Sequence, residues 1–441
     1  MNNDNIVTDI SILGEAKIPS PIQRKANGTD CISLISDDSR VLIDVKLSEL
    51  FKTIEAGKTP SSFEQAGPRC NIFFDPSKLR GALVTCGGLC PGLNDIIRSI
   101  VLELFYGYGV RNIFGIKYGL EGFIPKYGHD IIDLTPDYVA NIHQRGGSVL
   151  GSSRGPQHID EIVDCLERMN IGILFMIGGD GTLTAATRIA ETVLKRNLKI
   201  SIVGVPKTID NDIHMVSRSF GFDTAVDVAT NAIKGAHNEA EGYPNGIGLI
   251  KLMGRHSGFI AANAVLAQQD VNFVLIPEVE FDLEGPNGLL YAVEKRLADR
   301  GHAVIVVAEG AGQNFFSGDH TEHDASGNVK LKDIGIFLKE ALTSYFRSRK
   351  IDISIKYIDP SYMIRSLPAN TNDRIFCNFL GRNAVHAGMA GKTNLLIGYW
   401  NNCFVHVPMV AVAGKRKKID PLGNLWRSAL EATGQQSLLN Q

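Results

Sequence analysis

A short segment of the chain places an amine, a hydroxyl and two carboxylates directly after an apolar run. The run spans residues 200–205, and the polar residues are Lys207, Thr208, Asp210 and Asp212. A carboxylate within hydrogen-bond reach can take the proton from a hydroxyl group that attacks phosphorus. Asp210 and Asp212 are therefore candidate general bases. The alternative interpretation is a turn that caps the next helix, and it suits Asn211 and Asp212 better.

Two glycine-rich segments follow other apolar runs. Residues 86–94 include Gly87 and Gly88, and residues 177–182 include Gly179 and Gly181. Glycine lets backbone N–H groups approach an anion, and the N-terminus of the following helix adds a positive end. The first segment matches neither common phosphate-binding fingerprint, so a tight connection without a ligand stays an open alternative there.

The second glycine segment also contains a carboxylate and a hydroxyl. Asp180 can hold Mg²⁺, directly or through water, next to backbone donors for phosphate oxygens. Thr182 is suited either to cap the following helix or to contact a phosphate. The segment therefore predicts a site for a phosphorylated ligand with a magnesium ion.

The elements that must position these residues alternate between apolar runs and helical patterns. The runs are residues 82–84, 173–177, 200–205, 248–252 and 303–307, and helical patterns include 93–105 and 183–194. Such continuous apolar runs are typical of parallel strands covered on both faces. The pattern predicts an α/β fold with two doubly wound, mostly parallel sheets. Ligands of such sheets bind beyond the carboxyl ends of the strands, where the polar residues above occur.

Composition excludes several other classes of protein. The 441 residues contain 45 basic and 47 acidic side chains, which gives no electrostatic footprint for nucleic acid. The basic run 415–418 is short and is interpreted as a solvated tail segment. The seven cysteines indicate reduced thiols rather than a disulfide framework, and Cys86 and Cys90 lack a second pair at zinc spacing. We expect a cytoplasmic protein, because the sequence shows no signal peptide and no apolar stretch that would span a membrane.

Seven motifs, in this order and spacing, resemble the 6-phosphofructokinase family over roughly residues 79–410. They are GGLCPGLN, LGSSRG, GGDGT, PKTIDND, KLMGRHSG, IPEVEF and AEG. The resemblance implies a phosphofructokinase-like fold, transfer of a phosphoryl group from Mg-ATP to fructose 6-phosphate in glycolysis, and self-association as a homotetramer or homodimer. It also implies domains at 76–221 with 366–415 and at 222–365, and a C-terminal tail at 416–441. Residues 1–75 are polar with weak periodicity and are interpreted as an N-terminal extension, in which residues 41–46 could form a short strand.

The resemblance implies a role for each matching residue. Asp210 matches the proton acceptor, with Thr208 and Lys207 beside it, and Asp180 matches the residue that engages Mg²⁺. The nucleotide positions are Gly87, Gly88, Arg154, Gly155, Gly179, Asp180, Gly181 and Thr182. The sugar-phosphate positions are Thr208, Ile209, Asp210, Met253, Gly254, Arg255, Glu309, Lys356, Tyr362, Met363, Ile364 and Arg365. For Tyr362 the alternative is a half-buried core tyrosine.

Two positions resemble a code for the phosphoryl donor. Pyrophosphate-dependent relatives usually carry Asp and Lys there, and this chain carries Gly181 and Lys207. An Asp at 181 would place charge where the α-phosphate of a nucleotide must lie, so Gly181 favours ATP. The Gly–Lys combination resembles the atypical ATP-dependent branch. The alternatives are a pyrophosphate-dependent enzyme, a kinase with another acceptor, and an inactive regulatory subunit.

Some features bear on regulation. Gly246 stands where short bacterial enzymes place a subunit-bridging arginine, so such a contact is not expected. Residues 277–281 resemble a segment near the effector site of allosteric relatives, although the sequence indicates no particular effector.

Overall fold

The computed structural model describes residues 6–22, 34–316 and 329–440. The chain divides into two compact units. The first comprises residues 1–209, 213–221 and 366–416, and the second comprises residues 210–212, 222–365 and 417–441. Parts of the predicted extension, residues 1–5 and 23–33, lie outside the described residues. Its remaining residues belong to the first unit, whereas the predicted tail belongs to the second from residue 417 onward.

The first unit is built on a large sheet. Its strands, in spatial order, are β3 (Arg40–Leu42), β4 (Ser62–Gln65), β17 (Cys403–Pro408), β16 (Leu395–Trp400), β10 (Ser201–Pro206), β9 (Ile173–Gly178), β6 (Arg80–Thr85), β7 (Asn112–Ile116) and β8 (Ile131–Asp133). The five central strands from β16 to β7 are parallel, and antiparallel strands flank them on both sides. The residues of β9 and β10 are all buried, as expected for parallel strands covered on both faces.

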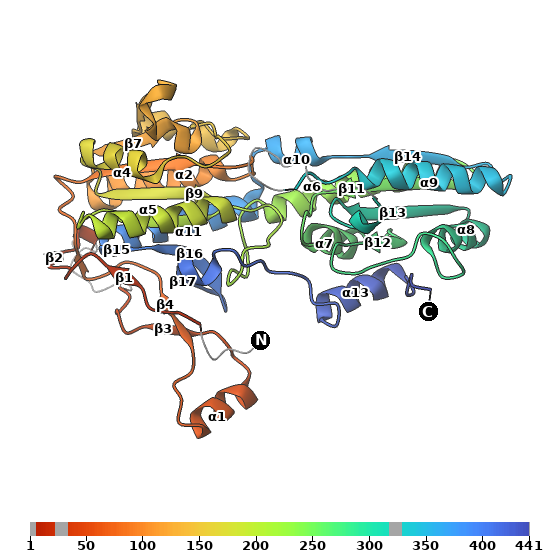
Figure 1. Cartoon of the computed structure of the whole chain (residues 1–441), viewed down its shortest axis with the longest axis horizontal. Coiled ribbons are helices and arrows are strands. Elements are labelled where there is room, and N and C mark those ends of the chain that lie inside the picture. Colours follow the sequence, from red (N-terminus) through yellow and green to blue (C-terminus); the bar gives the residue numbers. More distant parts are fainter. Residues whose placement is uncertain (1–5, 23–33, 317–328, 441) are drawn as a thin grey trace. The chain divides into compact units, whose positions relative to one another are not determined.

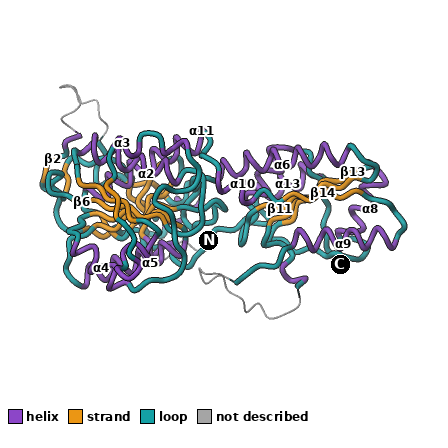
Figure 2. The backbone as a smooth tube through the Cα atoms, turned by 90° about the horizontal axis from the view of Figure 1, so that it is seen from above, coloured by secondary structure: helices purple, strands orange, loops and turns teal. Residues whose placement is uncertain are grey.

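Helices cover both faces of this sheet (Figures 1 and 2). On one face lie α4 (Ile159–Arg168) and α5 (Asp180–Lys195), and on the other lie α2 (Leu93–Leu102) and α11 (Thr371–Met389). The predicted helix at 93–105 ends as an α-helix at Leu102 and continues as a π-helix over Glu103–Tyr108. Shorter helices in this unit are α1 (Leu47–Glu55), α3 (Pro136–Val139) and α12 (Met409–Val412).

Small strand pairs attach the N-terminal segment to the rest of the unit. β1 (Ser11–Ile12) pairs with β15 (Lys392–Thr393), and β2 (Ile18–Pro19) pairs with β5 (Asn71–Ile72). The short strand expected near 41–46 is β3, which ends at Leu42.

A buried charge network also joins this segment to the large sheet. Glu64 of β4 lies 2.7 Å from Arg69, 2.6 Å from Lys392 and 3.1 Å from Nδ1 of His406, which belongs to β17. Burial opposes ionisation of the Glu64 carboxyl, but hydrogen bonds and charge from His406 and Lys392 outweigh burial and lower its pKa. Removing one partner of such a network leaves a buried charge uncompensated, which is strongly destabilising.

The second unit contains a smaller sheet, and all its strands are parallel. Their order is β12 (Phe273–Leu275), β13 (His302–Ala308), β11 (Gly246–Leu252) and β14 (Ser354–Ile358). On one face pack α6 (Phe222–Glu241), α7 (Phe259–Gln268) and α13 (Asn424–Thr433), and on the other pack α8 (Leu289–Arg300) and α9 (Ile334–Ser348). α10 (Ser361–Ser366) follows β14.

The alternation of side chains on β11 separates the two layers of this unit. Ile247 and Leu249 belong to the core shared with α8 and α9. Gly248 faces α6, and a Cβ at this position would approach the carbonyl oxygen of Ala236 to 2.9 Å. The glycine therefore allows α6 to pack closely on the sheet.

The α/β fold with mostly parallel sheets is confirmed. Within the described ranges, no helix has the length and apolarity that crossing a bilayer requires.

Candidate active site

The glycine segments and Lys207 of the first unit lie at one edge of the large sheet. β9 pairs in parallel with β6 and β10, and the register sets Thr85 opposite Ile177 and Pro206 opposite Gly178. The carboxyl ends of the three strands therefore meet at the same edge. Backbone hydrogen bonds continue past the strands, from the N–H of Cys86 to Ile177 (2.9 Å) and from the N–H of Lys207 to Gly178 (2.9 Å).

The side chain of Lys207 reaches into the first glycine segment. Its Nζ donates to the carbonyl oxygen of Gly88 over 2.7 Å. A Cβ at Gly87 would lie 3.3 Å from the same Nζ, and Gly87 has a φ of +81°, which disfavours other residues. The glycine therefore makes room for a cation beside the loop. The structure brings together Gly87, Gly88 and Lys207.

The segment that contains Arg154 lies against the same loop. The Ser152 hydroxyl donates to the carbonyl oxygen of Gly87 over 2.6 Å. A Cβ at Gly88 would lie 3.8 Å from Nη2 of Arg154, and Gly155, with a φ of +97°, follows the arginine. Arg154 and Lys207 thus supply two cations beside a loop rich in backbone N–H groups, which is an arrangement suited to phosphate oxygens.

The second glycine segment leads into α5, whose N-cap residue is Gly179. Asp180 is in the first turn, where its side chain is 33% exposed. Its Oδ1 accepts from the Gly414 N–H over 3.3 Å, and its Oδ2 lies 3.8 Å from Nη2 of Arg416. A Cβ at Gly181 would meet open space. This end of α5 therefore presents a carboxylate beside room for a ligand.

Thr182 is buried in the first turn of α5. Gly179 caps the helix, so the interpretation of Thr182 as the cap residue is wrong. Thr182 is buried, and a Cβ at Gly178 would overlap its side chain. Its hydroxyl also forms a hydrogen bond with the Cys86 thiol, which burial keeps at a pKa of about 12. Thr182 therefore packs the turn between β9 and α5.

A second group of predicted residues lies at the carboxyl edge of the smaller sheet. Leu252 of β11 is opposite Ala308 of β13, so Met253–Arg255 and Glu309 follow neighbouring strand ends. The N–H of Glu309 donates to Leu252 (2.9 Å), and the N–H of Gly310 donates to Gly254 (3.1 Å). Gly310 has to be a glycine, because a Cβ there would overlap the carbonyl group of Arg255.

Arg365 completes this group from the third strand end. It comes from α10, after β14, and its Nε donates to Sδ of Met253 over 3.2 Å. Arg365 and Arg255 both favour ionisation of the Glu309 carboxyl, although burial is the larger effect and raises the pKa of Glu309. The guanidinium group of Arg255 also contacts the carbonyl oxygen of Val329.

Asp210 belongs to the same group. The residue is partly exposed, but its Oδ1 is buried, and the Ser257 hydroxyl donates to its carbonyl oxygen over 3.3 Å. Burial raises the pKa of Asp210 to about 7, and the negative charges of Asp212 and Glu309 add to the rise. Arg365 and the backbone N–H of Arg255 oppose it. A carboxyl group with a pKa near neutrality is poised to exchange a proton with a substrate hydroxyl.

The remaining predicted residues divide between the strand ends and other places. Thr208, whose carbonyl oxygen accepts from Ser219, and buried Ile209 lead from β10 toward Asp210. Tyr362 and Met363 are 83% and 67% exposed, whereas Ile364 is buried. The alternative interpretation of Tyr362 as a half-buried core tyrosine is therefore wrong. Lys356 pairs with Gly248 in the middle of β14, lies 3.7 Å from Glu239 and places its ammonium over the ring of Tyr243, so it is not at the carboxyl end of the strand.

Two lysines at the edge of the second unit were missed from the sequence. Lys251 of β11 forms ion pairs with Asp333 (2.7 Å) and Asp359 (2.9 Å). Burial opposes its charge, but these two partners outweigh burial and raise the pKa of Lys251. No local pattern marks this lysine, because both partners lie far along the chain.

Lys417 corrects the interpretation of the run 415–418 as a solvated tail segment. Its backbone N–H donates to Asp212 over 2.7 Å, and its ammonium lies over the ring of Phe259. Burial lowers the pKa of Lys417 to about 8, against the opposing charge of Asp212. Lys417 therefore places a cation beside the predicted base loop.

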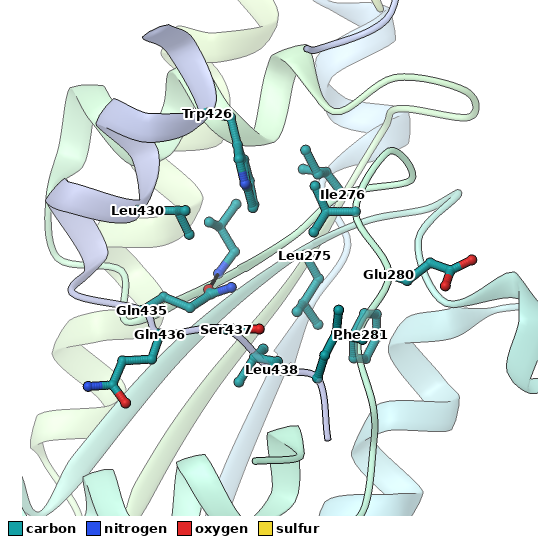
Figure 3. A pocket seen from close by; sticks show the side chains of 13 residues that line it. Leu275, Ile276, Glu280, Phe281, Trp426, Leu430, Gln435, Gln436, Ser437 and Leu438 are labelled. Atoms are coloured by element: carbon teal, nitrogen blue, oxygen red, sulfur yellow. Dashed lines mark hydrogen bonds between the residues drawn. The ribbon is translucent and has the colours of Figure 1, made fainter. Parts of the chain in front are cut away.

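An apolar pocket in the second unit does not contain the predicted chemistry. It lies between β12 and the C-terminal segment, with Trp426, Leu430, Leu275 and Phe281 among its lining residues (Figure 3). Glu280 is the single titratable residue among the described residues that line it. The neighbouring Glu278 accepts from the N–H groups of Gly258 and Ile419 and so has a structural role in the segment expected near an effector site.

Comparisons with known proteins agree with the predicted resemblance. The family model described as "Phosphofructokinase" matches residues 80–388. An "ATP-dependent 6-phosphofructokinase" of Borreliella burgdorferi is 48% identical over 99% of this chain and 98% of its own length. Another, of Amycolatopsis methanolica, is 44% identical over 97% and 94%. "ATP-dependent 6-phosphofructokinase 7" of Arabidopsis thaliana is 46% identical over 86% and 78%.

Solved structures share the fold at lower identity. A pyrophosphate-dependent phosphofructokinase from Marinobacter aquaeolei aligns with a TM-score of 0.66 and 20% identity, covering 81% of this chain and 92% of its own. The phosphofructokinase of Pichia pastoris in the T-state aligns with a TM-score of 0.62 and 20% identity, covering 77% of this chain and 36% of its own.

Proposed function

Because the chain belongs to the phosphofructokinase family, we propose that it transfers the γ-phosphoryl group of ATP to the 1-hydroxyl of fructose 6-phosphate. The products are ADP and fructose 1,6-bisphosphate, as in glycolysis. The observation that carries the proposal is the 44–48% identity to two relatives named ATP-dependent 6-phosphofructokinase over nearly the whole chain. The inactive-subunit alternative is disfavoured, because Asp180, Asp210 and Arg255 are all present.

The first unit binds the nucleotide in this proposal. The glycine segments offer backbone N–H groups, and Lys207 and Arg154 lie beside the first of them. The N-terminus of α5 adds its positive end. Together these groups neutralise and orient the phosphate chain, and such positioning accounts for most of phosphoryl-transfer catalysis.

The position of Asp180 suits the role of a magnesium ligand. Its carboxylate is partly exposed at the start of α5, and Arg416 approaches it only to 3.8 Å. Carboxylate oxygen is the ligand that Mg²⁺ prefers, usually together with phosphate oxygens and water. When bound, the ion supplies positive charge to the phosphate oxygens. Arg416 contributes positive charge to the same carboxylate in this structure.

The second unit binds the sugar phosphate and supplies the base. Asp210 takes the proton of the 1-hydroxyl, with a pKa near 7 that suits this task at neutral pH. Arg255 and Arg365 bind phosphate oxygens through their planar forks, and Glu309 accepts a hydrogen bond from a sugar hydroxyl. The charge of Arg365 lowers the pKa of both Asp210 and Glu309, and the charge of Arg255 lowers that of Glu309.

Gly181 supports ATP over pyrophosphate as the donor. The position faces open space, so an aspartate there would add a negative charge without displacing any neighbouring group. That charge would oppose the α-phosphate of a nucleotide. The pyrophosphate-dependent enzyme from Marinobacter aquaeolei shares the fold at 20% identity and carries no argument about the donor.

A coupled assay with both donors tests the proposal. With fructose 6-phosphate and Mg²⁺, we expect turnover with ATP and none with pyrophosphate. Gly181→Asp should lower kcat/KM for ATP by at least ~10-fold, and Gly235→Asp is a matched control, because Gly235 is an exposed position of α6 that also faces open space. Turnover of the unaltered chain with pyrophosphate alone would contradict the donor assignment. A homotetramer or homodimer and a cytoplasmic location stay predictions.

A further inference from the structure

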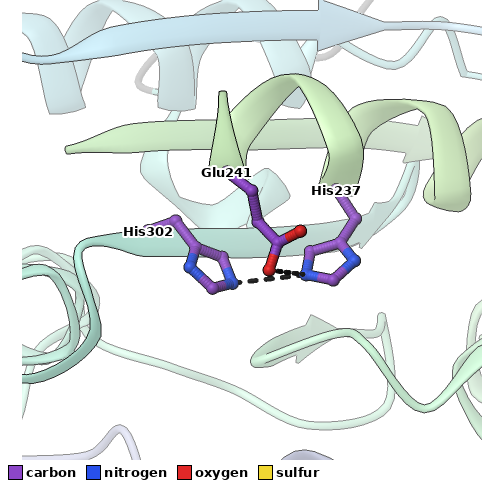
Figure 4. A group of neighbouring side chains, drawn as sticks. All are labelled: His237, Glu241 and His302. Atoms are coloured by element: carbon purple, nitrogen blue, oxygen red, sulfur yellow. Dashed lines mark hydrogen bonds and ion pairs between the residues drawn. The ribbon is translucent and has the colours of Figure 1, made fainter. Parts of the chain in front are cut away.

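A cluster of metal-ligating side chains lies in the second unit, outside the group of residues assigned to catalysis. His237 and Glu241 are one turn apart on α6, and His302 is the first residue of β13 (Figure 4). Nε2 of His237 lies 3.3 Å from Nε2 of His302 and 3.5 Å from Oε1 of Glu241. One ligand atom from each of the three residues falls within 4.8 Å of the others.

These separations match those of ligands around one small metal ion. Two ligand atoms at about 2.1 Å from a tetrahedral ion lie about 3.4 Å apart. The spacing of His237 and Glu241 also fits, because side chains four residues apart on a helix share one face. A hydrogen bond between the two imidazoles would account for the 3.3 Å between His237 and His302. It would not account for the approach of Glu241 to the same Nε2 of His237.

Each of the two histidines also has a polar neighbour outside the cluster. Nδ1 of His237 lies 3.6 Å from Oδ2 of Asp270. The ring of His302 forms a hydrogen bond with the backbone of Arg300. A carboxylate or carbonyl group behind a ligating imidazole fixes its tautomer and turns its other nitrogen toward the metal.

The remaining charges favour a cation over an anion. Glu241 would repel a phosphate or carboxylate ligand. Two imidazoles with one carboxylate suit zinc and similar transition metals better than Mg²⁺ or Ca²⁺.

We propose that His237, Glu241 and His302 form a divalent transition-metal site of the zinc class. The side chain of Glu241 is 54% exposed, so a fourth position is open to water or to another ligand. The site lies at the amino end of β13, whereas Glu309 follows its carboxyl end, and a seven-residue strand separates the two by about 20 Å. The metal joins the end of α6 to the start of β13 and is distinct from the magnesium used with ATP.

Metal binding to the full-length protein tests the site. The chelator-treated chain, without nucleotide, is titrated with Co²⁺ and, separately, with Zn²⁺. We expect one equivalent of Co²⁺ with the visible d–d absorption of a four- or five-coordinate nitrogen and oxygen site, and without the near-ultraviolet charge-transfer band of a thiolate. We also expect Zn²⁺ to displace the Co²⁺ and to raise the unfolding temperature.

Variants distinguish this site from adventitious binding. His237→Ala and His302→Ala should each weaken Co²⁺ binding by at least ~100-fold, and Asp270→Asn by about 10-fold. Glu241→Gln removes one ligand on an exposed side chain and reports on the site if the histidine variants do not fold. His129→Ala is the matched control, because His129 also lies near a glutamate, at 3.7 Å from Glu121, but belongs to no group of three metal-ligating side chains among the described residues. Equal binding by Glu241→Gln and the unaltered chain, or no stoichiometric binding by the latter, would overturn the proposal.

Discussion

Replacing Asp210 with asparagine should inactivate the enzyme and yet make it more stable at alkaline pH. The folded protein holds this carboxyl at a pKa of about 7, against an ordinary value of 3.8, mainly because of burial. A group whose folded pKa is raised binds protons more tightly in the folded state. Stability is therefore lost as the pH rises from about 4 to about 7, and asparagine, which cannot ionise, avoids that loss.

The two pKa values fix the size of the effect. The raised pKa costs the folded state about 4 kcal/mol at pH 8, and it costs about 1.5 kcal/mol at pH 5, where the carboxyl is protonated in the folded protein but mostly ionised in the unfolded chain. The stability advantage of Asp210→Asn should thus grow by roughly 2 to 3 kcal/mol between these pH values. For a unit of this size, that corresponds to several degrees in the unfolding temperature. Comparing the two pH values cancels any packing change common to both.

Thermal unfolding at pH 5 and pH 8 measures the effect, and a coupled assay measures activity. We expect kcat to fall by at least ~10²-fold, with little change in substrate binding. Asp352→Asn, at an exposed position in the same unit, is the control and should show no such growth with pH. An Asp210→Asn protein whose stability relative to the unaltered chain is the same at both pH values would refute the raised pKa.

Three other outcomes follow from the charges and thiols of the structure. Glu309→Gln removes a negative charge that raises the pKa of Asp210, so the acid limb of the plot of kcat/KM against pH should move to lower pH. A limb that does not move would contradict the effect of Glu309 on the pKa of Asp210. Glu64→Gln should lower the free energy of unfolding by ~3–5 kcal/mol in denaturant titrations, while Glu49→Gln, in an exposed pair with Lys52, should cost under about 1 kcal/mol. Iodoacetamide at pH 8 should modify exposed Cys70 and spare buried Cys86, whose pKa of about 12 leaves about 10⁻⁴ of the thiol ionised. Mass spectrometry of the protein alkylated in its native state shows which of the two cysteines is modified.

The strands and the strand-end residues could be predicted because their signals are local. An apolar run followed by glycine or charge marks a parallel strand and its carboxyl end in one stretch of sequence. The carboxyl ends of parallel strands meet at one edge of the sheet. Gly88 therefore lies close to Lys207, and Arg255 and Glu309 follow neighbouring strand ends. The N-terminal strands β3 and β4 have weak periodicity, since they gain their stability by pairing along the large sheet.

The sequence alone could not give contacts between distant segments. Lys251 is one polar residue in an apolar run, and its partners Asp333 and Asp359 are more than 80 residues away. Lys417 belongs to a basic run that looks solvated until its contact with Asp212 is known. The position of Lys356 could not be predicted for a different reason, because a residue within a strand can lie at either end, and the pairing with Gly248 sets Lys356 in the middle of β14.

The charges around Asp210 explain why the same edge needs both arginines. Asp212 and Glu309 raise the pKa of Asp210, and a bound sugar phosphate brings further negative charge, which would raise it again. A base that stayed protonated could not accept the hydroxyl proton at neutral pH. Arg365 already lowers the pKa of Asp210 and that of Glu309, whereas Arg255 acts on Asp210 through its backbone N–H and on Glu309 through its charge. We infer that the arginines hold the substrate phosphate and, by neutralising it, keep Asp210 able to act.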